Sequence, residues 1–76
     1  MVKLTGKIIR ETKDAVLLKI EEDEQSLLKG KTEWFAKSKI KISKNRHGKD
    51  VVRVQQWLYE MHLPAQLRIG EYKYWK

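Results

Sequence analysis

The sequence predicts a mainly β fold: a small SH3-like or OB-like barrel of four to five strands with one short helix. The chain has 76 residues, which suits a single domain over residues 1–76 that ends in a short aromatic tail. Apolar and polar residues alternate in several short segments, as they do in half-buried strands. Turn residues separate these segments, and only one stretch has helical spacing.

Residues 2–11 and 15–21 are predicted to form two strands of an antiparallel hairpin, because each has the period-of-two pattern. Lys13-Asp14 provides the turn between them. Gly6 lies in the middle of the first strand, where we expect a bulge or a sharp bend of the kind that small barrels need.

Residues 21–30 interrupt the alternation. Four consecutive acids at positions 21–24 precede Lys29-Gly30, an arrangement that suits one or two turns of helix. A loop without helix is the alternative. We expect the acids to be solvated, or to form a small negative patch that orients the protein on an anionic partner.

The extended pattern resumes over residues 31–43, with a kink expected at Ala36-Lys37-Ser38. Trp34 and Phe35 are consecutive, so on a strand they face opposite sides. If Ile40 and Ile42 set the inward phase, Trp34 lies in the core and Phe35 lies outside with the lysines. The kink could reverse this, so both orientations stay open.

A turn at residues 45–48 and a further short strand over residues 49–54 come next. Residues 55–62 are then predicted to be helical, because Val54, Leu58 and Met61 have the spacing of one helix face. Trp57 lies beside that face, and we expect it to pack in the core. The single proline of the chain ends the helix, and a last strand is expected near residues 66–69.

Three pieces of the chain, in order between residues 8 and 63, carry a resemblance: ETKDA at 11–15, EWFAKS at 33–38 and VQQWL at 54–58. The chain resembles small OB/SH3-like β-barrel modules of phages, plasmids and archaeal mobile elements, which show an E-x-W-hydrophobic-Pro-Lys-Ser motif. Ala36 and Gln55 stand where those modules have proline. The resemblance implies the barrel fold, a viral or mobile-element origin and an association with nucleic acid.

Positive charge is concentrated in the middle of the chain. The net charge is +7, from 17 Lys and Arg against 10 Asp and Glu, and such an excess attracts polyanions. Nucleic acid is the first candidate and an anionic membrane the second, while a solubilising Lys- and Glu-rich surface is the bland alternative. Most of the excess falls between residues 37 and 53, and the candidate phosphate-binding residues are Lys37, Lys39, Lys41, Lys44, Arg46, Lys49 and Arg53.

Lys37, Lys39 and Lys41 would project from one face of a regular strand. Such a stripe can neutralise successive phosphates, and each contact makes binding more sensitive to salt. The alternative is a solvated strand face whose lysines protect a sheet edge from aggregation.

Aromatic side chains are the second binding signal, because single strands are held by a basic groove and by rings on which bases stack. Either Trp34 or Phe35 is a candidate for stacking, and so are Tyr74 and Trp75 of the tail. The tail residues could instead pack on a partner or cover the open end of the barrel.

Catalytic and metal-binding signals are weak. The sequence has no cysteine, so disulfides, thiolate metal sites and cysteine nucleophiles are excluded. His47 and His62 lack the spaced companions that a metal site needs. We therefore expect no enzyme activity, no catalytic residue, no metal and no cofactor. No run resembles a signal peptide or a membrane span, so a cytoplasmic location and no membrane partner are expected.

Two functions remain. The first is a non-enzymatic nucleic-acid-binding module that favours single-stranded DNA or RNA over duplex. The second is a protein-binding adaptor or inhibitor of mobile-element origin. It would add a strand to a partner's sheet edge, dock through Trp57, Tyr72, Tyr74 and Trp75, or self-associate through an exposed aromatic tail.

Overall fold

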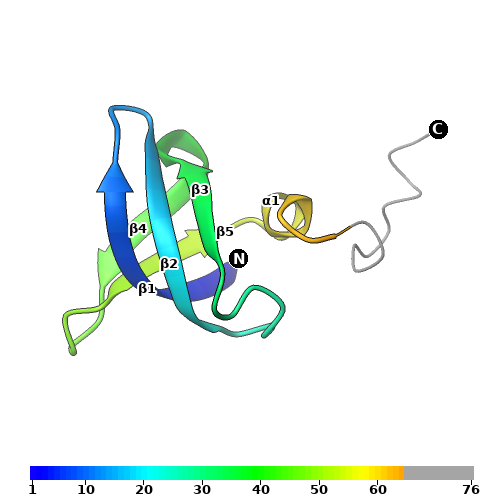
Figure 1. The fold of residues 1–76 in the computed structure, drawn as a ribbon, viewed down its shortest axis with the longest axis horizontal. Coiled ribbons are helices and arrows are strands. Elements are labelled where there is room, and N and C mark those ends of the chain that lie inside the picture. The colour runs from blue at the N-terminus through cyan, green and yellow to red at the C-terminus, as the bar shows by residue number, and fades with distance from the viewer. Residues whose placement is uncertain (65–76) are drawn as a thin grey trace.

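The computed structural model describes residues 1–64 and confirms a small, mainly β domain with one short α-helix (Figure 1). Its elements follow one another as a three-stranded meander, a short 3-10 helix, a hairpin and a helix. They are β1 (Val2–Glu11), β2 (Ala15–Asp23), β3 (Thr32–Ala36), the 3-10 helix η1 (Lys37–Lys39), β4 (Ile40–Lys44), β5 (Asp50–Val54) and α1 (Gln56–Met61). The strand expected near residues 66–69 lies outside the described residues.

All five strands belong to one antiparallel sheet with the order β3-β2-β1-β5-β4. The central strand, β1, is long enough to pair with β2 on one side and with β5 on the other. The sheet curls so that β1, β2 and β3 lie in front of β4 and β5 (Figure 1). It has the form of a small barrel that is not closed, since β3 and β4 remain its two edges.

Gly6 is the site of the expected bulge in β1. The register with β2 shifts between Thr5 and Gly6, and it shifts again between Ile8 and Arg10. A β-carbon on Gly6 would lie 1.9 Å from the carbonyl oxygen of Lys19. Only glycine allows the two backbones to approach this closely. The bulge bends β1, which pairs with β2 on one side and with β5 on the other.

The core lies on the inner face of the curled sheet. The alternating apolar residues of β1, β2 and β5 fill it, as the sequence pattern predicts, together with side chains from the loop after β2 and from the chain around α1. The buried members are Val2, Leu4, Val16, Leu18, Ile20, Leu28, Phe35, Val52, Val54, Tyr59 and Leu63. Leu28, Tyr59 and Leu63 therefore come from outside the sheet and cover the inner face.

The acidic segment differs from its prediction. Strand β2 continues to Asp23, and residues 24–30 form turns rather than helix. Asp23 is not solvated: it is 7% exposed, and its carboxylate accepts hydrogen bonds from the backbone N–H groups of Gln25 and Leu28, both at 2.8 Å. The Tyr59 hydroxyl donates a third bond, at 2.6 Å. Burial, then this contact, raises the pKa of Tyr59 well above its usual range.

Trp34 and Phe35 have the orientation that the kink makes possible. Phe35 is 1% exposed and packs in the core beside His62, with ring centroids 4.5 Å apart. Trp34 is 44% exposed. Extrapolation from Ile40 and Ile42 gives the wrong phase, because η1 interrupts the extended chain between β3 and β4.

Helix α1 lies where the sequence predicts it, but the face that it turns toward the core is not the predicted face of Val54, Leu58 and Met61. Tyr59 and Glu60 are buried, whereas Met61 is 61% exposed and Trp57 is 46% exposed. The expected packing of Trp57 in the core is therefore wrong. The helix has six residues and begins directly after Gln55, which follows β5. Its orientation is set by the docking of Tyr59 onto Asp23 rather than by a long apolar stripe.

Replacing Asp50 with asparagine is expected to destabilise the protein at neutral pH. The backbone N–H of Ile8 donates to this carboxylate at 2.8 Å, and Lys44 pairs with it at 2.9 Å. The Ile8 hydrogen bond, followed by Lys44, holds the pKa of Asp50 below its usual value of 3.8. The ionised form therefore stabilises the fold above this pH, and the benefit is lost as the pH falls through the folded pKa.

The measurement is the melting temperature of the wild type and of Asp50→Asn, from neutral pH to below 3.8. The difference should be largest at neutral pH and should narrow in acid. Asp14→Asn, at the exposed β1–β2 turn, is the control. A difference that is constant over the whole range would contradict the linkage.

Candidate nucleic-acid interface

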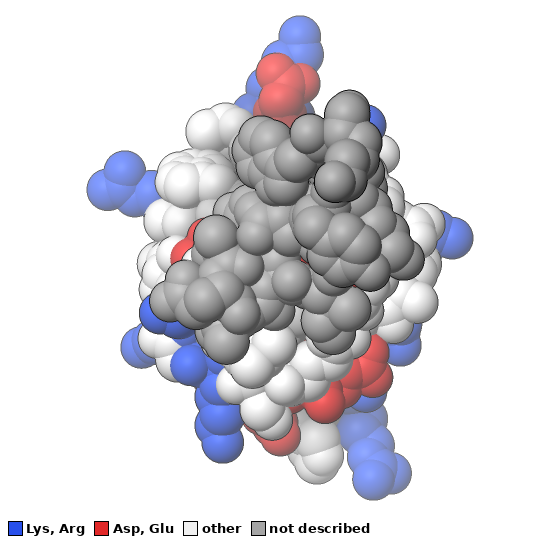
Figure 2. Space-filling view, turned by 90° about the vertical axis from the view of Figure 1, so that its right-hand side faces the viewer, with Lys and Arg blue, Asp and Glu red and all other residues white. Residues whose placement is uncertain are grey.

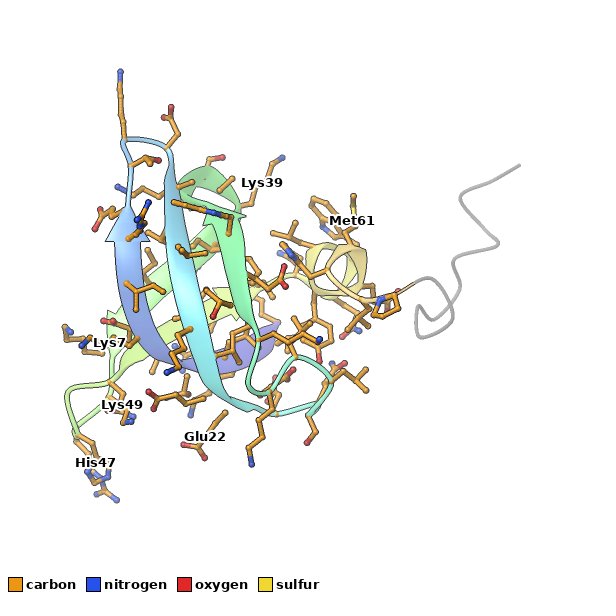
Figure 3. The ribbon with its side chains drawn as sticks, viewed as in Figure 1. Lys7, Glu22, Lys39, His47, Lys49 and Met61 are labelled. Carbon is orange, nitrogen blue, oxygen red and sulfur yellow. The ribbon has the colours of Figure 1, made fainter. Side chains whose placement is uncertain are left out.

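The seven candidate cations lie on four different elements. Lys37 and Lys39 belong to η1, Lys41 and Lys44 to β4, Arg46 and Lys49 to the β4–β5 turn, and Arg53 to β5. The expected stripe along one regular strand is therefore wrong, because only Lys41 of the three alternate lysines lies on a strand. Lys39 lies near α1, while Lys49 lies beside His47 at the far end of the hairpin (Figure 3).

Three of these cations are bound to acids. Lys37 pairs with Glu11 at 2.5 Å, Lys44 pairs with Asp50, and Lys49 pairs with Glu21. The hydrogen bond between Lys49 and Glu21 lowers the pKa of the carboxyl and raises that of the amine. Within residues 1–64, no acid pairs with the remaining four, which are Lys39, Lys41, Arg46 and Arg53.

A row of cations crosses three neighbouring strands. Arg53 of β5 lies directly opposite Lys3 of β1 on one side and Lys41 of β4 on the other. Residues directly opposite in antiparallel strands share a face, and like charges in such positions are unfavourable for folding. All three are exposed, and Arg53 donates to the Ser43 hydroxyl at 3.3 Å. This row concentrates positive potential on the outer face of the sheet.

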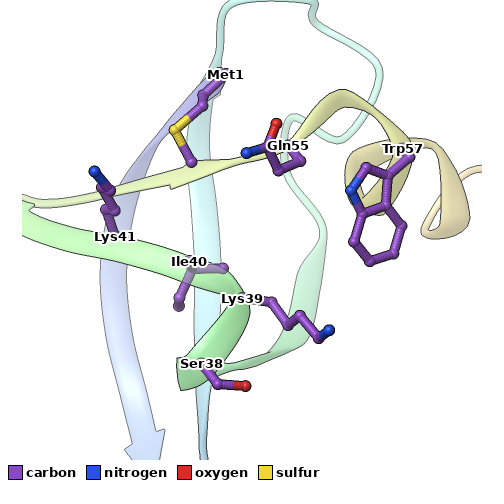
Figure 4. Close-up of a pocket in the computed structure, with 7 residues that line it drawn as sticks. All are labelled: Met1, Ser38, Lys39, Ile40, Lys41, Gln55 and Trp57. Carbon is purple, nitrogen blue, oxygen red and sulfur yellow. The ribbon is translucent and has the colours of Figure 1, made fainter.

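A hollow lies next to this row, where η1, β4 and α1 meet (Figure 4). Its lining combines an aromatic ring, two lysines and small polar and apolar groups: Met1, Ser38, Lys39, Ile40, Lys41, Gln55 and Trp57. The ammonium of Lys39 lies 5.8 Å from the centroid of the Trp57 ring, within the range of a cation–π contact. The hollow thus presents a ring edged with positive charge.

The hollow and the row are continuous because both contain Lys41. We call their combination the Trp57 surface, and it consists of Lys3, Lys39, Lys41, Arg53 and Trp57. It ends in an acidic region at Lys3, whose backbone N–H donates to Glu24 at 2.8 Å. The surface therefore has an aromatic end at α1 and a cationic middle, bounded by negative charge.

The sequence does not indicate Lys3 as a candidate, because Lys3 enters the row only through the long-range pairing of β1 with β5. It indicates Trp57 as a core residue or a protein-docking residue, but not as a nucleic-acid contact. Phe35 is buried and cannot stack on a base, whereas Trp34 is available on β3. Tyr74 and Trp75 lie outside the described residues. Arg46 lies in the β4–β5 turn, away from the hollow.

The Trp57 surface carries groups that can bind a ligand, namely cations and an aromatic ring. In the part of the chain that the structure describes, no group of three or more His, Cys, Asp or Glu residues could hold a metal ion, and no helix could cross a bilayer. Seen from the α1 end, Lys and Arg side chains project around the rim of the molecule, with smaller groups of acids between them (Figure 2).

Comparisons with protein-family models, curated proteins and solved structures gave no match.

Proposed function

We propose that the protein is a non-enzymatic module that binds single-stranded nucleic acid through the Trp57 surface. The observation that carries the proposal is the hollow lined by Lys39, Lys41 and Trp57, in which the Lys39 ammonium lies 5.8 Å from the centroid of the exposed ring. Basic grooves with exposed rings hold single strands, since every base has a face that can stack.

Each part of the surface has a role in this proposal. A base stacks on Trp57, and Lys39 beside the ring attracts the adjoining phosphate. Lys41, Arg53 and Lys3 then hold the backbone across the outer face of the sheet. In a duplex the base faces are already stacked on one another, so the ring would add nothing, and only the cations would contribute. Single strands are for this reason the preferred ligand.

Trp57→Ala is expected to weaken binding to a short oligothymidylate by about 5- to 150-fold, the range that corresponds to losing one stacked base at about 1–3 kcal/mol. Trp57→Phe should retain most of the affinity, because it keeps a ring. Fluorescence anisotropy of a labelled oligonucleotide measures the affinity.

Met61→Ala is the matched control, because this side chain is exposed on the same helix and is not part of the hollow. Its affinity should equal that of the wild type. Equal affinity of Trp57→Ala and the wild type, or equally tight binding of a duplex, would contradict the stacking role of Trp57. Circular dichroism confirms that each variant is folded.

A second candidate function is a protein-binding adaptor or inhibitor, and the open edge of the sheet favours it. Strand β4 is an edge strand and carries the exposed side chain of Ile42, so a partner could add a strand there. Co-purification with one protein that survives nuclease and high salt would support this function over the first.

The proposed ligand implies a cytoplasmic location, where nucleic acid is accessible. The resemblance to modules of phages, plasmids and archaeal mobile elements predicts that the protein is encoded by a virus or a mobile element.

A further inference from the structure

A second basic and aromatic cluster lies on the outer face of β1, β2 and β3. Leu17 of β2 lies opposite Arg10 on one side and Trp34 on the other. In the neighbouring row, Lys19 lies opposite Lys7 and Thr32. We call this cluster the Trp34 surface, and it consists of Lys7, Arg10, Leu17, Lys19 and Trp34.

The positive charge of this surface is compensated only in part. Its three cations and its tryptophan are exposed, and its two rows contain no acid. Lys7, Arg10 and Lys19 form no ion pair with any residue of the described part. Outside the two rows, Glu21, which Lys49 binds, attracts Lys7 and Lys19, and Asp50, which Lys44 binds, attracts Lys7. Lys7 and Lys19 face each other directly, a placement that costs stability.

The Trp34 and Trp57 surfaces are separate. Because the sheet is curled, the outer faces of β2 and β3 and the outer face of the β4–β5 hairpin point in opposite directions (Figure 1). On β1, Lys3 of the Trp57 surface and Lys7 of the Trp34 surface are four residues apart, about 13 Å at roughly 3.3 Å per residue. The three cations of the Trp34 surface line neither the hollow nor the cationic row, so a short segment of nucleic acid held there leaves them uncovered.

We propose that the Trp34 surface is a second contact for single-stranded nucleic acid, so that one domain holds two segments at the same time. This inference rests on the proposed function and adds that one protein molecule joins two segments of nucleic acid. Three cations outside any ion pair of the described residues match a phosphate backbone, and the exposed tryptophan on the adjoining strand β3 offers a stacking face. Two segments of one long strand, or two separate strands, would be drawn together.

The test uses the full chain, an immobilised oligothymidylate and a second, fluorescent oligothymidylate. Wild-type protein is expected to capture the fluorescent strand on the immobilised one, and native mass spectrometry should show one protein with two oligonucleotides. The variant Lys7→Gln/Lys19→Gln/Trp34→Ala should keep the single-strand complex but lose capture by about tenfold or more, because it removes two phosphate contacts and one stacked base.

The control is Lys13→Gln/Lys31→Gln/Met61→Ala, which removes two positive charges and one large apolar side chain at exposed positions outside both surfaces. It should capture as the wild type does. Wild-type protein that binds one oligonucleotide but never two overturns the second contact and leaves the proposed function intact. Wild-type protein that binds none overturns both.

Two further outcomes also overturn the inference. If the Trp34 variant loses the single-strand complex as strongly as it loses capture, the two surfaces act as one site. If it captures normally but no longer binds vesicles of phosphatidylserine that the wild type binds, the Trp34 surface contacts an anionic membrane instead. Native mass spectrometry separates bridging by one protein from bridging by a protein dimer.

Discussion

Replacement of Gly6 by alanine is expected to remove most of the stability of the protein at 25 °C. The new β-carbon would lie 1.9 Å from the carbonyl oxygen of Lys19 and 3.0 Å from the backbone nitrogen of Glu21. Both are backbone atoms of β2, so no side chain can rotate to relieve the clash. Relief requires the separation of β1 from β2, the central pair of the sheet. We expect a loss of about 4 kcal/mol or more, which belongs to the exceptional class of single substitutions.

A loss of this size is comparable to the whole stability of a small domain, which is about 5 kcal/mol at the low end of the usual range. Urea unfolding followed by circular dichroism measures it. Gly48→Ala is the control: this glycine has a φ of +79° but open space around it, so only the left-handed backbone costs about 1–2 kcal/mol. A Gly6→Ala protein that is as stable as Gly48→Ala would contradict the close approach of β1 and β2.

The triple variant Lys3→Gln/Lys41→Gln/Arg53→Gln is expected to lose most of the affinity for single-stranded nucleic acid at physiological salt. The three residues form the cationic row, and each is proposed to hold one phosphate. Loss of three contacts should reduce the slope of log affinity against log salt by about 2, at roughly 0.7 per phosphate on a single strand. Titrations between about 50 and 200 mM salt measure the slope.

The matched control removes the same number of charges elsewhere. Lys13, Lys29 and Lys31 are exposed on turns and loops outside the Trp57 surface, so their replacement by glutamine changes the net charge equally. If the effect depends on the row, the control keeps the slope of the wild type within about 1. If both triple variants behave alike, binding follows net charge alone, and the row has no specific role.

Most of the sheet could be predicted from local pattern. The alternation around Leu4, Leu18 and Val52 fixes which side of each strand is buried, because a period of two leaves one apolar face. A glycine in the middle of an alternating segment, Gly6, correctly predicts the bulge at which β1 approaches Lys19 of β2. The helix between Gln56 and Met61 also follows from spacing and from the proline behind it.

The candidate site could be predicted only in part, because it depends on contacts between distant segments. Lys41 was identified from the local run of charge, but its neighbour Lys3 is placed there by the pairing of β1 with β5. The side chain of Trp57 points outward because a six-residue helix takes its orientation from Tyr59, whose partner Asp23 lies 36 positions away. Such pairing leaves no periodic signal in the sequence.

The hydrogen bond between Asp23 and Tyr59 also affects how the loop after β2 and helix α1 move. A helix of six residues is far too short to persist alone, and the same carboxylate that holds Tyr59 organises the turn at Gln25 and Leu28. Release of this carboxylate is therefore expected to loosen the loop and the helix together, although the ion pair between His62 and Glu33 also holds the end of the helix to β3. We therefore expect the placement of the Trp57 indole to depend on this local opening before it depends on global unfolding.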